Sequence, residues 1–592
     1  MDAIRIVCVT LGFVVILLKL IIRSRTSTSR RPPPGPWQLP LIGSLHHLLL
    51  SRFRGHPHRA LREMSATYGP LMLLRFGSVD TLVASTAEAA REVMRTHDLA
   101  FCSRHLSATL DTISCGGKGI LFSRYGDRWR DLRKVCMLEL FHQRRVLSFR
   151  GVREEEVARL LRSVSGECAG GGGRAADVDL GEAICRMVND IVVRTAIGGR
   201  CRYRDEFLRW LDEGVHLAGG FNLADLYPSS RLVRRFSVAA RDMGRCQRNI
   251  HRIIEGIIHE RAVTGMRMPE EREDDLLGVL LRLQKEGGLP FHLTNEIIST
   301  VILISSLSTT SIPGKKEEEV AGKERDSPGK KRSLLRLAVA RSWSRGQGRP
   351  WSGDGGRRSE VAHRERRSGR RGKEEEKRGR DIFAAGSETS STVLVWAMSE
   401  LVKNPRVLHK AQSEVRETFK GQEKLTEDDM AKLSYLHLVL KEALRLHTPV
   451  PFLLPRECRE ACRVMGYDVT KGTKVFVNVW AISRDGEVWG DGEVFRPERF
   501  EGSGVDFRGN DFEFTPFGAG RRICPGITHG LANMELVLAS LLYHFDWEVP
   551  GGGGSDELDM TEAFGITLRR KSKLVLKATP RVSFVSKSPN SV

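Results

Sequence analysis

The chain has 592 residues, of which 40% are hydrophobic, so it can form one large core or several domains. Its eleven cysteines are odd in number and lack paired metal-ligand spacing. This excludes a disulfide framework and indicates reduced thiols in a cytosol-facing protein. The formal charge of +21 is unevenly spread, because residues 314–380 hold 22 Lys and Arg against 11 Asp and Glu. That segment therefore carries about half of the net charge.

The N-terminus predicts a membrane anchor over residues 1–22. Residues 6–22 are apolar apart from Thr10 and Lys19, and at about 1.5 Å per residue they reach the lower limit for spanning a bilayer. Arginines follow directly, and the positive-inside bias places the rest of the chain in the cytosol. A cleaved signal peptide is the alternative, but basic residues end the apolar run in place of a small-x-small cleavage site.

Residues 23–40 are basic and proline-rich. Pro32-Pro-Pro-Gly-Pro36 cannot continue a helix and forms a stiff segment. We expect this hinge to hold a globular body at a set angle to the membrane.

The first half of the body begins with two short strands predicted around a turn over 70–84, followed by a helix over 86–96. Residues 103–122 contain glycines and are expected to be irregular. A helix is predicted over 126–138, where Trp129 and Arg133 lie four residues apart and project from one face. Taken alone, this spacing is also typical of a surface stacking pair.

A helix that starts near Leu293, with Thr294 as its N-cap, runs into a low-complexity tract over 304–380. The tract holds too few apolar residues to fold, and the helical pattern resumes at Asp381. Deleting the tract joins the two halves into one amphipathic helix. Our hypothesis is that 304–380 is translated non-coding sequence, such as a retained intron or a gene-model error. A nucleic-acid-binding insert is the rival, disfavoured because Trp343 and Trp351 are its only aromatics.

The resumed helix carries Ala385-Gly386-Ser387-Glu388-Thr389. Glu388 and Thr389 form an acid–alcohol pair that could pass protons to a bound group. The alternative is a set of polar residues on a solvated helix face.

The carboxyl third is predicted to contain a helix over 433–446, a strand over 474–480 and a closing strand over 574–576. On the helix, Glu442 and Arg445 lie three residues apart, the usual spacing of an exposed ion pair. Arg499 lies about fifty residues further on, within Pro497-Glu-Arg-Phe500.

Residues 514–526 form a glycine-rich loop around Cys524, followed by an apolar run. Small residues let a flat ligand approach the backbone, and a loop that donates N–H groups to sulfur suits a thiolate bound to a metal. The start of a helix after Cys524 would add partial positive charge near the thiolate. A lone cysteine among glycines can equally be a buried thiol in a turn.

Phe517, Gly520, Arg522, Cys524 and Gly526 fill, in order, F-x-x-G-x-R-x-C-x-G, which resembles the haem-binding loop of the cytochrome P450 family. Four further motifs occur in the order of that family, namely W-x-x-x-R, A-G-x-[DE]-T, E-x-x-R and P-E-R-F. The resemblance covers residues 30–580 except 304–380, and its details are similar to plant microsomal, A-type (family-71-like) members. It implies a mainly α fold with small β-sheets (α+β) over 41–303 and 381–592, preceded by the transmembrane helix.

The resemblance also implies roles for individual residues. Cys524 would be the axial ligand of the iron, and Gly386, Glu388 and Thr389 would serve oxygen activation. Glu442, Arg445 and Arg499 would form a buried structural triad. The haem-contacting residues would be Trp129, Arg133, Arg456, Phe517, Gly518, Arg522 and Gly526. The residues facing substrate would be Phe383, Ala384, Ala385, Val450, Phe452, Leu453, Leu454, Phe564 and Ile566.

The implied activity is insertion of one oxygen atom from O2 into a hydrophobic specialised metabolite, with terpenoid, indole and phenolic substrates all open. The cofactor would be haem b (iron protoporphyrin IX), with electrons from NADPH through NADPH-cytochrome P450 reductase or cytochrome b5. No nucleic acid partner is expected, and the location would be the endoplasmic reticulum membrane. Two alternatives stay open. The tract could leave the product inert, or the protein could be a haem-thiolate isomerase or dehydratase, which the acid–alcohol pair disfavours.

Overall fold

The computed structural model describes most of the chain beyond the N-terminus, and all described residues belong to one compact unit. The described ranges are 31–170, 175–199, 203–219, 221–264, 275–287, 289, 291–302 and 383–582. The expected anchor (1–22), the first part of the hinge and the tract 304–380 lie outside the described residues. Within these ranges, no helix combines the length and apolarity needed to cross a bilayer.

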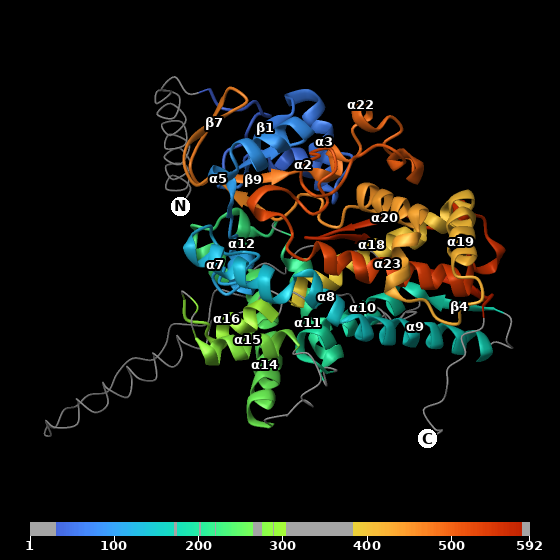
Figure 1. The fold of residues 1–592 in the computed structure, drawn as a ribbon. Helices are drawn as coiled ribbons and strands as arrows, with labels where there is room; N and C mark the ends of the chain where they lie inside the picture. The colour runs from blue at the N-terminus through green and yellow to red at the C-terminus, as the bar shows by residue number, and fades with distance from the viewer. Residues whose placement is uncertain are drawn as a thin grey trace, which may run out of the picture. The chain divides into compact units, whose positions relative to one another are not determined.

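Most of the regular structure is helical, as predicted (Figure 1). The longer helices are α3 (Pro57–Tyr68), α7 (Asp127–Val135), α9 (Arg150–Gly170), α10 (Leu180–Ile197), α11 (Arg204–Leu217), α14 (Val238–Thr264), α15 (Leu276–Glu286), α16 (Asn295–Ile302), α18 (Phe383–Lys403), α19 (Pro405–Thr418), α20 (Ser434–Leu446) and α23 (Ile527–His544). The shorter helices are α2 (Leu45–Leu50), α4 (Ala87–Arg91), α5 (Asp98–Phe101), α6 (Ala108–Ile113), α8 (Gln143–Ser148), α12 (Leu223–Leu226), α13 (Arg231–Phe236), α21 (Val479–Ile482) and α22 (Gly486–Trp489).

Helix ends follow local chemistry. Asp179 caps α10 by accepting a hydrogen bond from the Glu182 N–H at 3.0 Å, and Gly198 ends the helix with a φ of 71°. Thr294 accepts from the Ile297 N–H at 3.3 Å, which confirms it as the N-cap of α16. The predicted helix over 433–446 is confirmed as α20, and the helix that resumes after the tract is described from Phe383 onward as α18.

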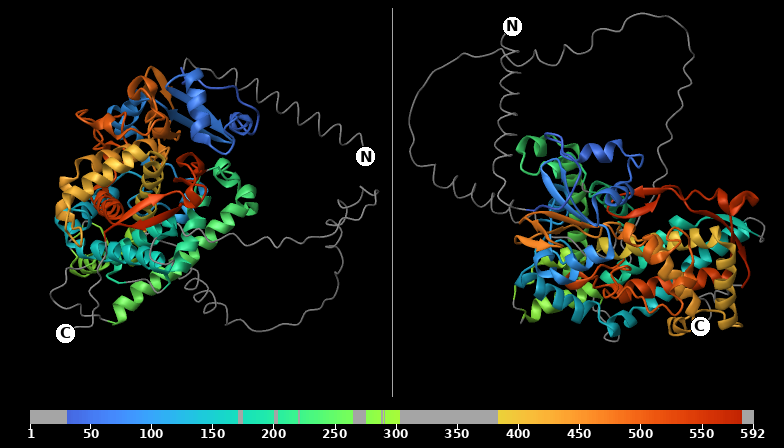
Figure 2. Two further views of the ribbon diagram at one scale, coloured as in Figure 1. Left: turned by 90° about the vertical axis from the view of Figure 1, so that its right-hand side faces the viewer. Right: turned by 90° about the horizontal axis from the view of Figure 1, so that it is seen from above.

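The largest hydrophobic core lies among α9, α10, α18, α19, α20 and α23. Helix α18 contacts α10 and α23, and Figures 1 and 2 show it running through the middle of this helical layer. Leu394 and Met398 of α18 and Val537 of α23 are fully buried there. Burial of apolar surface stabilises the folded state by roughly 25 cal/mol per Å². The apolar contacts of this layer therefore hold α18 in place.

The strands form a five-stranded sheet, which lies away from the helical layer in Figure 1, and smaller pieces, of which the sheet containing β4 packs against that layer. In the large sheet the order is β1 (Leu71–Phe76), β2 (Val79–Ala84), β9 (Lys474–Val477), β6 (Arg456–Glu457) and β3 (Ser103–Arg104). Neighbours pair antiparallel except β2 with β9, which run parallel with Thr81 opposite Lys474. The smaller pieces are the sheet β10 (Phe545–Glu548), β13 (Val575–Pro580) and β4 (Ala176–Asp179), and the hairpins β11 (Glu562–Phe564) with β12 (Leu568–Arg570) and β7 (Cys462–Val464) with β8 (Tyr467–Val469).

Several predicted boundaries change. The strand expected over 474–480 ends at Val477, because the Asn478 side chain accepts from the Ala481 N–H and starts α21. The segment 103–122, expected to be irregular, contains β3 and α6. The hinge residues from 31 onward, which the structure describes, also contact the folded body. The Pro34 carbonyl accepts a hydrogen bond from the Leu73 N–H of β1 at 2.9 Å.

Candidate functional site

A cavity of about 290 Å³ lies between the cysteine loop and the start of α18. Its wall brings together Cys524, Gly386 and Thr389, which are far apart in the sequence. Most of the lining is apolar, and four arginines interrupt it: Arg104, Arg133, Arg456 and Arg522. The site therefore combines one thiol, an acid–alcohol pair and several cations within apolar walls.

The cysteine loop is closed by its own backbone. The Cys524 N–H donates to the Phe517 carbonyl at 3.0 Å. Gly520 has a φ of 65°, and a Cβ there would lie 2.2 Å from the Met94 carbonyl oxygen, so only glycine fits. Burial raises the pKa of the Cys524 thiol, while the Gly526 backbone N–H and the charge of Arg133 act to lower it. Both lowering contacts favour the thiolate, which is the form that binds a metal.

The arginines concentrate positive charge at the wall, and of the two whose contacts follow only Arg456 pairs with a carboxylate among the described residues. Arg522 donates to the Cys102 and Ser123 carbonyls, each at 2.6 Å, and burial lowers its pKa to about 9. Arg456 donates to the Ala519 carbonyl at 3.0 Å and to Asp98 at 3.3 Å. Within the described part of the chain, the buried Nε of Arg456 has no hydrogen-bond partner. An unmatched buried donor beside these charges fits a ligand that carries carboxylates.

Arg104 belongs to this set and was missed from the sequence. It donates to the Leu121 carbonyl at 3.0 Å and to the Leu454 carbonyl at 2.8 Å. Burial, with the charges of the neighbouring arginines, holds its pKa well below the usual value. No short motif surrounds Arg104, so the sequence carries no signal for it.

Trp129 and Arg133 share a helix face at the cavity, as predicted from their spacing. The Trp129 indole N–H donates to the Ile120 carbonyl at 2.9 Å, so in this structure that donor is engaged within the protein and not directed to the cavity. Arg133 donates to the Ile523 carbonyl at 2.8 Å, which ties α7 to the residue before Cys524.

The acid–alcohol pair lies in the first turns of α18. Gly386, Glu388 and Thr389 line the cavity. The buried Glu388 carboxylate accepts from the Thr567 hydroxyl at 2.8 Å and lies 3.2 Å from Arg569 Nε. Both partners come from the C-terminal hairpin and were not anticipated, because nothing local in the sequence links them to Glu388.

The residues expected to face substrate divide into three groups. Val450, Leu453, Leu454 and Ile566 line the cavity. Phe452 and Phe564 do not, which corrects the prediction: Phe452 stacks on Phe476 with ring centres 4.8 Å apart, and Phe564 stacks on His58 at 5.6 Å. Phe383, Ala384 and Ala385 form the first turn of α18, and their side chains lie outside the described residues.

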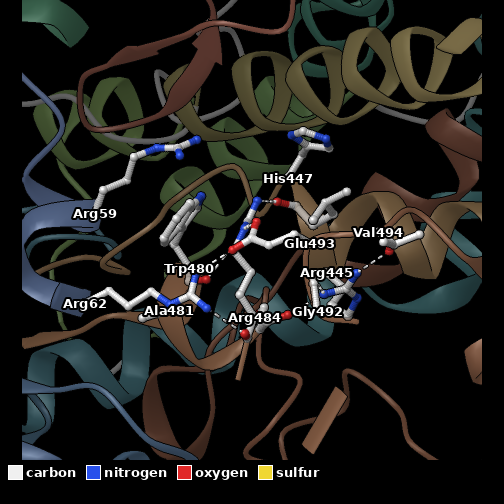
Figure 3. A network of polar contacts seen from close by, with 12 residues as sticks. Arg59, Arg62, Arg445, His447, Trp480, Ala481, Arg484, Gly492, Glu493 and Val494 are labelled. Atoms are coloured by element: carbon white, nitrogen blue, oxygen red, sulfur yellow. Dashed lines mark hydrogen bonds and ion pairs between the residues drawn. The ribbon is translucent and has the colours of Figure 1, made fainter. Parts of the chain in front are cut away.

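The three charges expected to form a structural triad do lie together and are buried. Arg445 Nε lies 2.7 Å from Glu442 Oε2, and Arg499 Nε lies 2.9 Å from Glu442 Oε1. Arg445 also donates to the carbonyls of Gly492 (2.7 Å) and Val494 (3.2 Å), as Figure 3 shows. The spacing alone was equally compatible with an exposed pair.

A second buried cation adjoins this triad. Arg484 lies 3.0 Å from Glu493 and 4.0 Å from the Trp480 ring centre, and burial lowers its pKa to about 10. Arg62 reaches Glu493 from α3, and Figure 3 shows both guanidinium groups directed at that carboxylate. Sequence reasoning did not identify this network.

These features define a class of protein, one built to hold a flat anionic macrocycle whose metal is bound by a cysteine thiolate. The comparisons with known proteins identify the family. The cytochrome P450 family model matches residues 32–313 and 376–576, and the chain belongs to that family. Its cofactor is haem-thiolate iron, which receives electrons from NADPH through a reductase.

The chain is similar to plant enzymes over nearly its full length. It is 42% identical to the ent-isokaurene C2/C3-hydroxylase of Oryza sativa subsp. japonica, over 94% of each chain. It is 40% identical to the zealexin A1 synthase of Zea mays, over 99% of each. It is 38% identical to the 5-epiaristolochene 1,3-dihydroxylase of Nicotiana tabacum, over 96% of each. Membership of this family makes the chain a cytochrome P450 monooxygenase.

Proposed function

We propose that the protein inserts one oxygen atom into a hydrophobic specialised metabolite, with terpene hydrocarbons as the first candidates. The observation that carries this proposal is the single cavity that joins Cys524 to Thr389 between apolar walls. Three relatives named for ent-isokaurene, ent-cassadiene and 5-epiaristolochene favour terpenes. A fourth, named desmethyl-deoxy-podophyllotoxin synthase, keeps phenolic substrates open.

In this proposal each part of the site has one task. Cys524 would ligate the iron, and Arg104, Arg133, Arg456 and Arg522 would take up the charge of the macrocycle's carboxylates. When bound, haem supplies the iron at which dioxygen is activated. Thr389 and Glu388 would move protons toward that oxygen. Val450, Leu453 and Ile566 would exclude water and hold the apolar substrate against the reacting centre.

We further propose the arrangement of the chain in the cell. Residues 1–22 would anchor it in the endoplasmic reticulum membrane, 23–40 would form the hinge, and 41–303 with 381–592 would be the cytosolic catalytic domain. The cysteine side would receive electrons from NADPH-cytochrome P450 reductase, with cytochrome b5 as a second donor, since basic residues there suit an acidic partner.

The tract 304–380 would be an insertion into the catalytic domain. The family match stops at residue 313 and resumes at 376, which agrees with this interpretation. The tract precedes Gly386 by little more than a helical turn, and this favours one second candidate: a product that binds haem poorly and is inert.

The test compares this chain with its 304–380 deletion, each expressed with a reductase. A panel of ent-isokaurene, ent-cassadiene and 5-epiaristolochene serves as substrate, and oxidised products are identified by mass spectrometry. The reduced carbon-monoxide difference spectrum reports thiolate ligation. We expect that spectrum and a hydroxylated terpene from the deletion at least. A signal from the deletion alone would establish the inert-product candidate, and thiolate ligation in neither would overturn the assignment of Cys524.

Cys524→Ser is the matching loss-of-ligand variant, and Cys102→Ser is its control. Cys102 is also buried, and its thiol donates to the Leu99 carbonyl at 3.2 Å, so its substitution perturbs the same region without removing the ligand. We expect the thiolate spectrum to disappear in the first variant and to persist in the second.

A further inference from the structure

The Glu388 carboxylate is held from outside its own helix. Thr567 Oγ1 donates to Glu388 Oε1 at 2.8 Å, and Arg569 Nε lies 3.2 Å from the same oxygen. Glu388 and Thr567 are both buried and both line the cavity, whereas the Arg569 side chain is 21% exposed. The carboxylate therefore joins the cavity to a cation that reaches solvent.

The turn that presents Thr567 is held by backbone hydrogen bonds. The Gly565 N–H donates to the Thr567 carbonyl at 3.0 Å, which makes a tight turn. The next residue, Leu568, donates its N–H to the Pro449 carbonyl at 2.9 Å and accepts from the Trp396 indole at 3.1 Å. These bonds hold the backbone from which the Thr567 side chain reaches Glu388.

The hairpin follows one face of α18. Arg570, next to Arg569, donates to the Ser399 hydroxyl at 2.6 Å. Glu388, Trp396 and Ser399 lie on the same side of a helix with 3.6 residues per turn, so the hairpin contacts that side over about three turns. The contact at Glu388 is the one that reaches the cavity.

We propose that Thr567 and Arg569 are positioning residues that hold the Glu388 carboxylate in place for proton delivery. This inference rests on the proposed function. Productive turnover converts RH, O2, two electrons and two protons into ROH and water. If proton delivery is misdirected, O2, two electrons and two protons give hydrogen peroxide, and the substrate is left unchanged. Because Ile566 on the same turn lines the cavity, the element that contacts substrate also fixes the acid.

The experiment uses the full chain with its reductase, NADPH and ent-isokaurene as the probe hydrocarbon. The variants are Thr567→Val, Thr567→Ser and Arg569→Gln. Arg570→Gln is the matched control, because Arg570 lies on the same strand but contacts Ser399 and the Asp559 carbonyl. The readout is the amount of hydrogen peroxide released per NADPH oxidised. This ratio can be measured whether or not the substrate is oxidised. The carbon-monoxide difference spectrum is recorded for every variant.

We expect Thr567→Val and Arg569→Gln to raise the peroxide ratio roughly threefold or more, since a positioned general acid contributes far more than that. Thr567→Ser and Arg570→Gln should stay near the unsubstituted protein, and all should keep the thiolate spectrum. The inference would be overturned if Arg570→Gln raised the peroxide ratio equally, or if Thr567→Val did not raise it. Either result would mean that the hairpin only packs against α18 and does not position the acid. Absence of the thiolate spectrum from the unsubstituted chain would instead overturn the proposed function beneath it.

Discussion

The guanidinium carbon of Arg522 lies 4.0 Å from the ring centre of Trp129. Among the residues that the structure describes, no carboxylate forms an ion pair with Arg522, and this stack helps a positive charge to be buried two residues before Cys524. The planar group also donates to three backbone carbonyls, those of Cys102 and Ser123 at 2.6 Å and that of Ile120 at 3.4 Å. One side chain thus joins α7, the segments on both sides of α6 and the cysteine loop.

Replacing Arg522 by Lys should lower haem retention. Lysine keeps the charge but loses the planar fork that donates to Cys102 and Ser123 while stacking on Trp129. Loss of charge-assisted hydrogen bonds costs about 1.5–3 kcal/mol each, so haem bound per polypeptide should fall clearly. The neighbouring Arg521→Lys is the control, because that side chain is half-exposed and contacts Asp98. Equal haem content in the two variants would contradict this prediction.

Replacing Glu442 by Ala should strongly destabilise the fold. The change leaves the buried guanidinium groups of Arg445 and Arg499 without their shared carboxylate. Breaking a buried pair in this way costs about 3–5 kcal/mol. Chemical denaturation measures the change in the free energy of unfolding. Glu63→Ala removes the exposed contact with Arg52 and should cost at most about 1 kcal/mol. If both variants changed the free energy of unfolding only slightly, the buried triad would contribute no more to stability than an exposed ion pair.

Glu562 should make stability fall at acid pH. Burial raises the pKa of Glu562, but the hydrogen bond from His58 and the charge of Arg59 outweigh it and hold the pKa far below its usual value. A depressed carboxyl pKa contributes stability that is complete above the unfolded-state pKa, about 4.3 for Glu, and is lost as the pH falls toward the folded-state value.

The free energy of unfolding, measured by denaturation between about pH 7 and 3, should therefore decline more steeply in the unsubstituted protein than in Glu562→Gln. The two curves should approach each other toward the acid end without meeting, because the folded-state pKa of Glu562 lies below this range. Parallel curves would show that Glu562 does not carry this part of the acid dependence.

Substitutions of the adjacent residues Phe452 and Leu453 should distinguish a side chain that packs in the core from one that contacts substrate. Leu453 lines the cavity, so Leu453→Ala should change the products or the substrate-induced spectral shift while leaving the fold intact. Phe452 packs against Phe476 in the core, and Phe452→Ala should cost about 3–5 kcal/mol in the free energy of unfolding. Product analysis and denaturation are run on both variants. A product change confined to Phe452→Ala would reverse the assignment.

The sequence predicted what depends on local spacing. Thr294 caps its helix, the two strands over 70–84 form, and Cys524 and Thr389 meet at one cavity because short motifs specify both. It did not predict which way neighbouring side chains turn: Leu453 has a φ of 52°, an unusual backbone angle that no pattern signals. Contacts across long sequence distances were equally hidden, as with Glu388 and Thr567.

The cavity wall starts at Arg104 and ends at Thr567, and β13 then pairs with both β10 and β4. Because ribosomes make the chain from its N-terminus, the wall cannot be complete before residue 567 has been synthesised, nor this sheet before its last strand, β13. A polypeptide that stops before β11 would retain Cys524 but lack Ile566 and Thr567, and with them one side of its pocket. A complete pocket for the cofactor therefore forms only after nearly all of the described chain has been made.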